Sequence, residues 1–180
     1  MTANFRSTRP VEGEFPPYMT RYIALVPEGD IVETLARQRM ELNKFLTAIP
    51  ESMGDYKYGP EKWSIKEVIG HMADGERVFG YRALRFSRAD ATPVEGFDEN
   101  TYVANSRFSS AKLSELIDEL DHLRHTSVHL FSKLDDDGMA REGSANGVNV
   151  TVRSLAFIIA GHTNHHIGIL TNRYLNKKSE

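Results

Sequence analysis

The sequence predicts an all-α protein, a four-helix bundle preceded by an extended N-terminal arm. Three observations indicate this fold. Four long segments carry apolar residues at helical spacing, four of the seven prolines fall within the first 29 residues, and hydrophobic residues make up 40% of the 180-residue chain. That apolar fraction is ordinary for a compact globular protein. We therefore expect an arm over residues 1–29 and one helical domain over residues 30–180.

The elements can be justified in chain order. In the arm, each proline removes a backbone donor and fixes φ, so we expect an extended segment draped over the body. The first helix begins after Asp30, a typical N-cap residue, and ends at Pro50. The second begins with a capping box formed by Ser64 and Glu67 and continues to Phe86. A long ordered loop is predicted over residues 90–107. A third helix follows from Ser109 or Ser110 to Leu134 and ends at an acidic stop, residues 135–138. The last predicted elements are a short strand-like entry over residues 148–152 and a fourth helix from Leu155 to about Asn176.

Composition excludes several classes of function. The chain has no cysteine, so disulfides, thiolate ligands and a cysteine nucleophile are excluded. A formal charge of -3 provides no basic surface for a phosphate backbone, and we expect no nucleic-acid partner. The first ten residues lack the apolar stretch of a secretory signal, and no apolar run is long enough to span a bilayer. We expect a cytoplasmic protein without membrane association.

Two histidines of the fourth helix lie where apolar residues belong. A rotation of about 100° per residue places His162 and His166 at the centre of the stripe that also carries Leu155 and Ile158. Imidazoles four residues apart lie on one helix face, close enough to share a metal ion. The alternative is a pair of core histidines satisfied by backbone groups or water. We interpret the pair as two ligands of a divalent metal.

Two ligands leave such an ion under-coordinated, so a further ligand must come from another helix. His71, on the flank of the second helix's apolar stripe, is the candidate. His165 lies at the edge of its stripe, and we assign it to packing or to support of the ligands. The histidines of the third helix also share one face, but that face lies opposite the apolar stripe and should be solvated. These residues are His122, His125 and His129.

Two polar residues fall on predicted apolar faces. Glu76 lies in the middle of the second helix's stripe, and a buried carboxylate needs a partner. It is a candidate to hydrogen-bond a ligand imidazole or to carry a proton, but a structural ion pair with an arginine such as Arg82 or Arg173 is the simpler interpretation. Gln38 in the first helix raises the same question and is interpreted as a satisfied core residue.

Three sequence blocks resemble the DinB superfamily (DinB/YfiT-like metalloenzymes). They are residues 62–71 with the following 76–79, the loop Gly96–Asn100, and Gly161–Gly168. The resemblance implies an up-down-down-up four-helix bundle, often dimeric, with one histidine from the second helix and a pair from a later helix facing a cleft. Carried over residue by residue, these metal ligands are His71, His162 and His166.

The resemblance also implies a class of reaction. Characterised relatives include transferases and isomerases that use a low-molecular-weight thiol, so we expect a thiol S-transferase type of enzyme that uses an exogenous thiol to attack a small electrophilic substrate. The alternatives are a hydrolase using metal-bound hydroxide, or a non-catalytic metal-binding or stress-response protein. Three nitrogen ligands suit zinc or nickel, and also iron or manganese. We further expect a homodimer.

Overall fold

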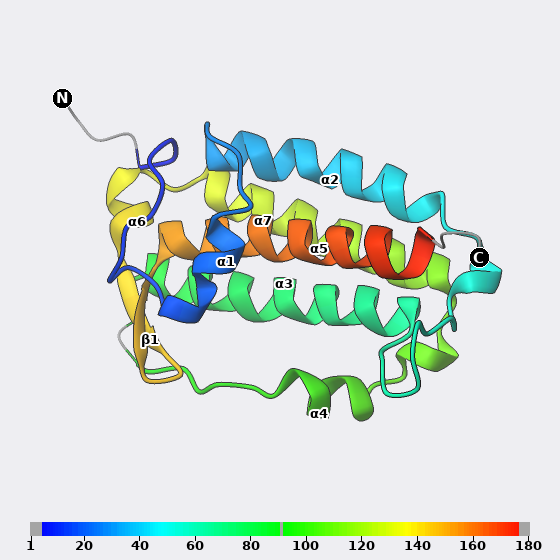
Figure 1. Ribbon diagram of the computed structural model, residues 1–180. Helices are drawn as coiled ribbons and strands as arrows, with labels where there is room; N and C mark the ends of the chain where they lie inside the picture. Colours follow the sequence, from blue (N-terminus) through cyan, green and yellow to red (C-terminus); the bar gives the residue numbers. More distant parts are fainter. Residues whose placement is uncertain (1–4, 91, 177–180) are drawn as a thin grey trace.

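The computed structural model describes residues 5–90 and 92–176. Four long helices form the body (Figure 1), and their bounds are α2 Ile31–Thr47, α3 Ile65–Ser87, α5 Leu113–Ser132 and α7 Val152–Ile169. Helices α2 and α7 run in one direction and α3 and α5 in the other, so the predicted up-down-down-up bundle is confirmed. Helix α3 packs against α5 and α7, and α2 packs against the same two helices. Over Leu170–Leu175, α7 continues as a π-helical turn.

The helix starts follow from local capping. The Asp30 carboxylate accepts hydrogen bonds from two backbone amides at the start of α2. Ser64 and Glu67 form the predicted capping box of α3, and the Thr151 hydroxyl caps α7. Helix α7 therefore begins at Val152, three residues before the predicted start. Each cap satisfies amides that the first turn of a helix leaves without partners.

The start of α5 was predicted three to four residues too early. Residues Phe108–Ser110 form a 3-10 turn (η3), and the helix begins only at Leu113. The cap comes from Glu51 in a short 3-10 turn (η2, Glu51–Met53), whose carboxylate accepts from the amides of Leu113 at 2.7 Å and Ser114 at 3.3 Å. Because this carboxylate lies far away in the sequence, no local pattern around residue 110 could reveal it.

The N-terminal arm lies over the body, as expected, but it is not wholly extended. Pro17–Met19 form a 3-10 turn (η1) that leads into the short helix α1, Thr20–Ile23, and α1 packs on α7. Pro17 stands in the first turn, where its missing amide costs nothing. The described part of the arm begins at residue 5, and the ends of both predicted segments, residues 1–4 and 177–180, lie outside the described residues.

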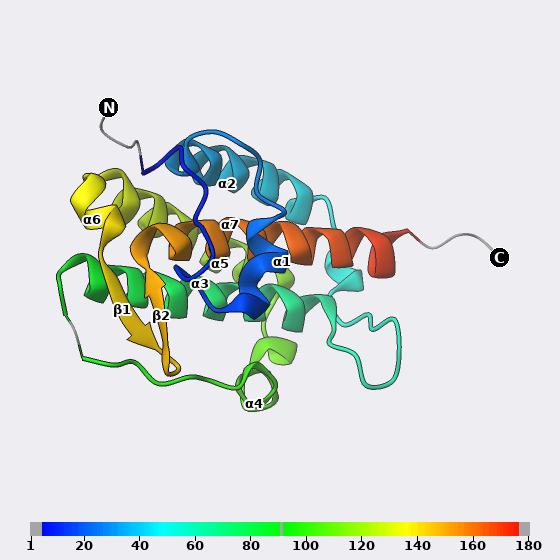
Figure 2. The same cartoon turned by 60° about the vertical axis from the view of Figure 1, so that its left-hand side comes forward.

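The connections carry small elements, of which α4 and the β-hairpin lie beside α3 (Figure 2). The loop after α3 contains the helix α4, Glu99–Ala104, which Asp98 caps. The acidic segment predicted as a stop instead starts the short helix α6, Asp136–Ala140. The predicted strand is confirmed as β2, Val148–Thr151, which pairs antiparallel with β1, Glu142–Ala145. Asn146 and Gly147 both have positive φ, as a two-residue hairpin turn requires.

The bundle core consists of two apolar clusters. One includes Leu35, Phe79 and Phe131, and the other includes Leu42, Ile69 and Leu120. Between these positions along the helices lie buried polar side chains, which therefore form a layer across the bundle. Within the described residues, no helix is both long and apolar enough to cross a membrane.

Candidate metal centre

Three buried imidazoles converge between α3 and α7. The Nε2 atom of His162 lies 3.0 Å from Nε2 of His71 and 3.0 Å from Nε2 of His166. Each residue keeps less than a tenth of its surface exposed. The structure thus brings together the three histidines that the sequence singles out, with one potential ligand atom from each within 4.8 Å of the others.

The helices position these rings for simple reasons. His162 and His166 lie one turn apart on α7, so their rings meet edge to face on one side of the helix, with centroids 4.4 Å apart. His71 reaches them from α3 and is flanked by the indole of Trp63, with centroids 4.8 Å apart. Gly75, one turn after His71, leaves room for the His162 ring: a methyl group there would lie 3.1 Å from His162 Cε1.

Burial keeps all three imidazoles neutral. It lowers the pKa of His71 to about 4, and the nearby carboxylate of Glu99 only partly opposes this effect. Burial also lowers the pKa of His162 and of His166 well below the usual value, and the neighbouring histidines add to the effect. Neutral imidazole is the form that binds metals.

The nitrogens meet the requirements of a metal site. Two nitrogens bound to one ion at about 2.0–2.1 Å with tetrahedral angles lie roughly 3.3 Å apart, close to the spacing here. Imidazole lone pairs that face each other at this distance repel unless a cation or a proton lies between them. The Nδ1 atom of His166 is buried without a hydrogen-bond partner, so among the described residues nothing fixes the tautomer of that ring.

The centre opens into a pocket of about 220 Å³. His71 and His162 line its inner end, and the arm, α3, the loop after α3 and the β-hairpin supply the other walls. The walls combine aromatic rings with two arginines and one carboxylate. The lining residues are Tyr18, Met19, Arg21, Tyr22, His71, Gly75, Phe79, Arg82, Gly96, Phe97, Glu99, Asn146 and His162. A small molecule in this pocket would reach two of the three imidazoles.

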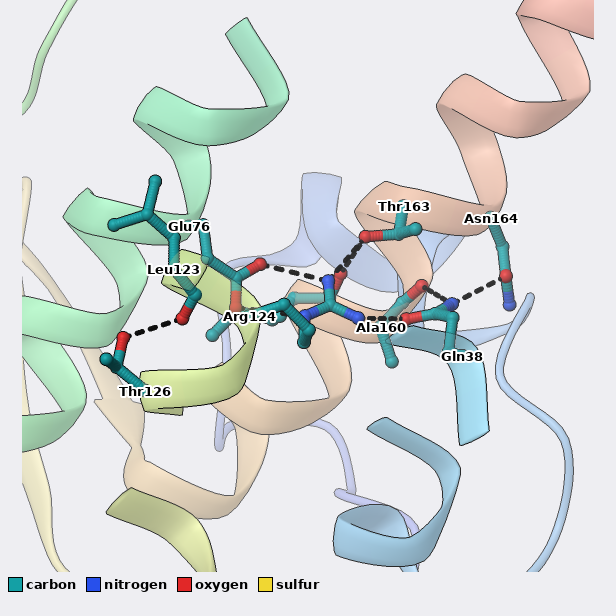
Figure 3. A network of polar contacts seen from close by, with 9 residues as sticks. Gln38, Glu76, Leu123, Arg124, Thr126, Ala160, Thr163 and Asn164 are labelled. Atoms are coloured by element: carbon teal, nitrogen blue, oxygen red, sulfur yellow. Dashed lines mark hydrogen bonds and ion pairs between the residues drawn. The ribbon is translucent and has the colours of Figure 1, made fainter. Parts of the chain in front are cut away.

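Beside the histidines lies a fully buried arginine, Arg124 of α5 (Figure 3). Its Nε and Nη2 donate to the two carboxylate oxygens of Glu76 at 3.0 and 2.9 Å. Further N–H groups donate to Gln38 Oε1 and to Thr163 Oγ1. The group connects all four long helices, and Thr163 directly follows His162 in α7. Gln38, Glu76, Arg124 and Thr163 are called the polar layer below.

The structural ion pair predicted for Glu76 is confirmed, but the two arginines suggested for it were wrong, because its partner is Arg124 rather than Arg82 or Arg173. Arg82 instead lines the pocket, where its Nη2 donates to the carbonyl of Glu95. The periodicity of α5 holds the signal that would have identified Arg124. It stands four residues after Leu120 and seven before Phe131, on the buried stripe itself.

The other histidines lie as expected. His165 is half-buried and packs its ring against Tyr22 and His166, with centroids 5.2 and 5.1 Å apart. The three histidines of α5 are exposed, which confirms that their shared face is solvated; they are His122, His125 and His129. Sequence reasoning missed Glu99, whose carboxylate enters the pocket wall from the first turn of α4.

Comparison with known proteins places this arrangement in a family. The chain resembles the solved structure of YfiT from Bacillus subtilis, described as "a probable metal-dependent hydrolase with an unusual four-helix bundle topology", with a TM-score of 0.69, 18% identity and coverage of 94% of this chain and 95% of that one. It also resembles a mycothiol-dependent maleylpyruvate isomerase, with a TM-score of 0.62, 14% identity and coverage of 85% of this chain and 60% of that one. At these identities the likeness concerns the fold.

No curated protein matches the sequence. The sequence profile of the DinB superfamily, however, matches residues 34–170, which include all four long helices except the first residues of α2. All three converging histidines fall within that range. The chain belongs to the DinB superfamily.

Proposed function

We propose that the chain is a metal-dependent enzyme that acts on a small molecule, with a divalent ion held by His71, His162 and His166. The observation that carries the proposal is the convergence of three neutral, buried imidazoles, two of which, His71 and His162, line a pocket. Zinc or nickel suits this donor set best, and iron or manganese is also compatible. Such an ion supplies Lewis acidity and lowers the pKa of a water or thiol bound to it.

The first candidate reaction is transfer of an exogenous low-molecular-weight thiol to a small electrophile. The chain has no cysteine, so the thiol must come from outside. The pocket has room for small groups beside His71 and His162, and aromatic side chains form part of its walls. The structural similarity to a mycothiol-dependent isomerase supports thiol-dependent chemistry, because that enzyme depends on a low-molecular-weight thiol.

The second candidate is hydrolysis by an activated water, which a different observation favours. Glu99 is the pocket's carboxylate, and it acts electrostatically on His71. A carboxylate beside the nucleophile can accept its proton and return it to the leaving group. We therefore assign Glu99, rather than Glu76, as the candidate acid and base, because both oxygens of Glu76 already accept hydrogen bonds from Arg124.

Metal binding is tested first. The apoprotein is titrated with zinc and with nickel, and bound metal is measured by elemental analysis after desalting. We expect one ion per chain and a loss of at least a hundredfold in affinity for His162→Ala, with His125→Ala, an exposed histidine on α5, as the matched control. Equal affinities of both variants would eliminate the centre.

Activity is then measured on the metal-loaded protein with a chlorinated aromatic electrophile and with an activated ester, each with and without added thiol. Thiol-dependent loss of the electrophile supports the transferase, whereas ester hydrolysis that thiol inhibits supports the hydrolase. A non-catalytic metal-binding or stress-response role predicts no turnover with either substrate, but a melting temperature that rises strongly with metal. In each case His162→Ala provides the baseline.

Assembly and location remain predictions. We expect a homodimer in the cytoplasm, with a small molecule as the substrate and no nucleic-acid partner. Sedimentation equilibrium of the metal-loaded protein tests the first point, and a fixed mass of one chain over a hundredfold concentration range would contradict it.

A further inference from the structure

One arginine of the pocket wall has no ionic partner. Arg82 on α3 keeps only 7% of its surface exposed and lines the pocket that opens on the histidines. Its Nη2 donates to the backbone carbonyl of Glu95 at 3.0 Å, while its buried Nε has no hydrogen-bond partner. Among the described residues no carboxylate lies within ion-pair distance of it. A buried guanidinium of this kind is costly unless something pairs with it.

Two other buried arginines are paired with carboxylates of the chain. Arg124 is paired with both oxygens of Glu76, and Arg153 is paired with Glu14. Arg82 has the same degree of burial as Arg153 but faces the pocket instead of a carboxylate of the chain. The missing partner is therefore expected to come from whatever occupies the pocket.

We propose that Arg82 binds the carboxylate of the substrate, so that the pocket selects a small organic anion with an apolar body. The inference deepens the proposed function and rests on it for the position of the reacting end. The Nη1 and Nη2 groups form the outer edge of a planar guanidinium fork, which matches a carboxylate. Phe79 and Phe97, which line the same pocket, provide apolar walls for the body of the molecule.

The geometry separates the bound carboxylate from the reacting atom. His71, Gly75, Phe79 and Arg82 follow one another along one side of α3, and the His162 ring lies at Gly75. Arg82 follows Gly75 by seven residues, a rise of about 10 Å along the helix axis, although the arginine side chain leans back toward the N-terminus and shortens the gap. The substrate thus presents its carboxylate at one end and its reacting group several bonds away.

Three charged side chains line the pocket. Glu99 acts electrostatically on His71 and Arg21 acts on His166, so both signs of charge lie near the histidines. Arg21 is exposed, whereas Arg82 is buried. Because charges attract more strongly away from water, a carboxylate is attracted more strongly to Arg82 than to Arg21.

The test uses benzoate and benzamide, which have nearly the same shape but differ in charge. Both are titrated into metal-free protein, which prevents direct coordination of the carboxylate to an ion, and binding is followed by NMR of the arginine Nε–H groups. We expect benzoate to bind at least tenfold more tightly than benzamide and to shift the Arg82 Nε–H signal. Inorganic phosphate at the same concentration should compete only weakly.

Three variants locate the effect. Arg82→Gln should reduce the benzoate-to-benzamide ratio to about one, and Arg82→Lys should leave an intermediate ratio because the charge remains but the fork is lost. Arg88→Gln, an exposed arginine just after α3, removes the same charge outside the pocket lining and should leave the ratio unchanged. A ratio near one in the wild type, a ratio that survives Arg82→Gln, or equal competition by phosphate would overturn the inference.

The outcome is separable from that of the proposed function, because zinc binding is measured on the same samples. If zinc binds through the histidines but benzoate and benzamide bind equally, the proposed metal centre is supported and the proposed class of substrate is contradicted. If benzoate binding depends on Arg82 while zinc does not bind, the proposed anion site is supported and the proposed metal-dependent function is contradicted.

Discussion

His162 is the residue around which the candidate centre is arranged, because its Nε2 lies 3.0 Å from those of both other histidines. Its ring is held by small and aromatic neighbours rather than by strong hydrogen bonds. Gly75 lies on one side, and Tyr22 and Phe79 approach edge-on with centroids 5.5 and 6.0 Å away. The position of this ring is thus set by packing, and packing changes should move it.

Gly75→Ala tests that dependence. The added methyl would lie 3.1 Å from His162 Cε1, so the ring must shift by a few tenths of an ångström. We expect zinc affinity to fall about tenfold, measured by competition with a chelator, while the fold is retained. Gly80→Ala on the same helix is the control, because its methyl meets only Ser127 Oγ at 3.5 Å. It should gain up to about 1 kcal/mol of stability from helix propensity and keep its zinc affinity.

The depressed pKa values of the histidines predict how the metal-free protein responds to acid. Because burial lowers the pKa of His71 to about 4, the unfolded chain binds a proton there near pH 6.5 and the folded chain does not. The free energy of unfolding should therefore fall as pH drops from 6.5 toward 4, by up to about 1.4 kcal/mol per pH unit for each such histidine. Above pH 6.5 these groups contribute no pH dependence.

Urea denaturation at pH 7, 6 and 5 measures this slope. His71→Gln should reduce it by about one proton relative to the wild type, and His129→Gln, an exposed histidine, should leave it unchanged. Parallel slopes for wild type and His71→Gln would show that His71 titrates normally in the folded protein. Competition between protons and metal is expected to begin well below pH 6, since the folded ligands stay neutral there.

At the scale of the helices, the polar layer fixes the relative positions of all four long helices. Its hydrogen bonds are directional, whereas apolar packing is not. Arg124 of α5 contacts Gln38 of α2, Glu76 of α3 and Thr163 of α7. Gln38 extends the group by donating to Ala160 O and to Asn164 Oδ1. A shift of α5 would thus be transmitted to the turn of α7 that carries His162.

Arg124→Met measures the strength of this connection. It leaves the Glu76 carboxylate buried without its partner, and the free energy of unfolding should fall by about 3–5 kcal/mol. The double variant with Glu76→Leu should recover much of that loss, because no buried charge remains. Arg39→Met removes the half-exposed pair with Asp121 between α2 and α5 and should cost under about 1 kcal/mol. Denaturation curves of the wild type and the three variants check all three values, and a double variant no more stable than Arg124→Met would contradict the coupling.

How much the sequence could predict also depends on the range of the contacts. His162 and His166 were predictable because two imidazoles at the centre of one helix stripe break a local pattern. His71 lies on the flank of its stripe, and the family resemblance was needed to choose it. Arg82 lies on the same side of α3 as His71, but the packing of the loop and of α4 that closes the pocket and brings in Glu99 is encoded by no helical period.

For the molecule as a whole, the N-terminal arm matters because it packs on the bundle and forms part of the pocket wall. It supplies Tyr18, Met19, Arg21 and Tyr22 to the pocket wall, and it is fixed to the bundle by several contacts. Asn164 of α7 donates to Leu25 O at 2.9 Å, and Arg153 pairs with Glu14. Without the docked arm, the side of the pocket formed by these four residues would be open to water.

Gly161→Ala tests this role of the arm. At Gly161 the α7 backbone meets the Tyr22 carbonyl so closely that a methyl group would overlap it, and a backbone atom cannot move aside as a side chain can. We expect the arm to detach locally, with faster amide exchange over residues 17–26 and loss of benzoate binding, while the exchange of α3 and α5 stays slow. Gly168→Ala, in the same helix with nothing within 4 Å of its added methyl, should behave as wild type. If both variants exchange alike, the arm is not held at this contact and the pocket does not depend on it.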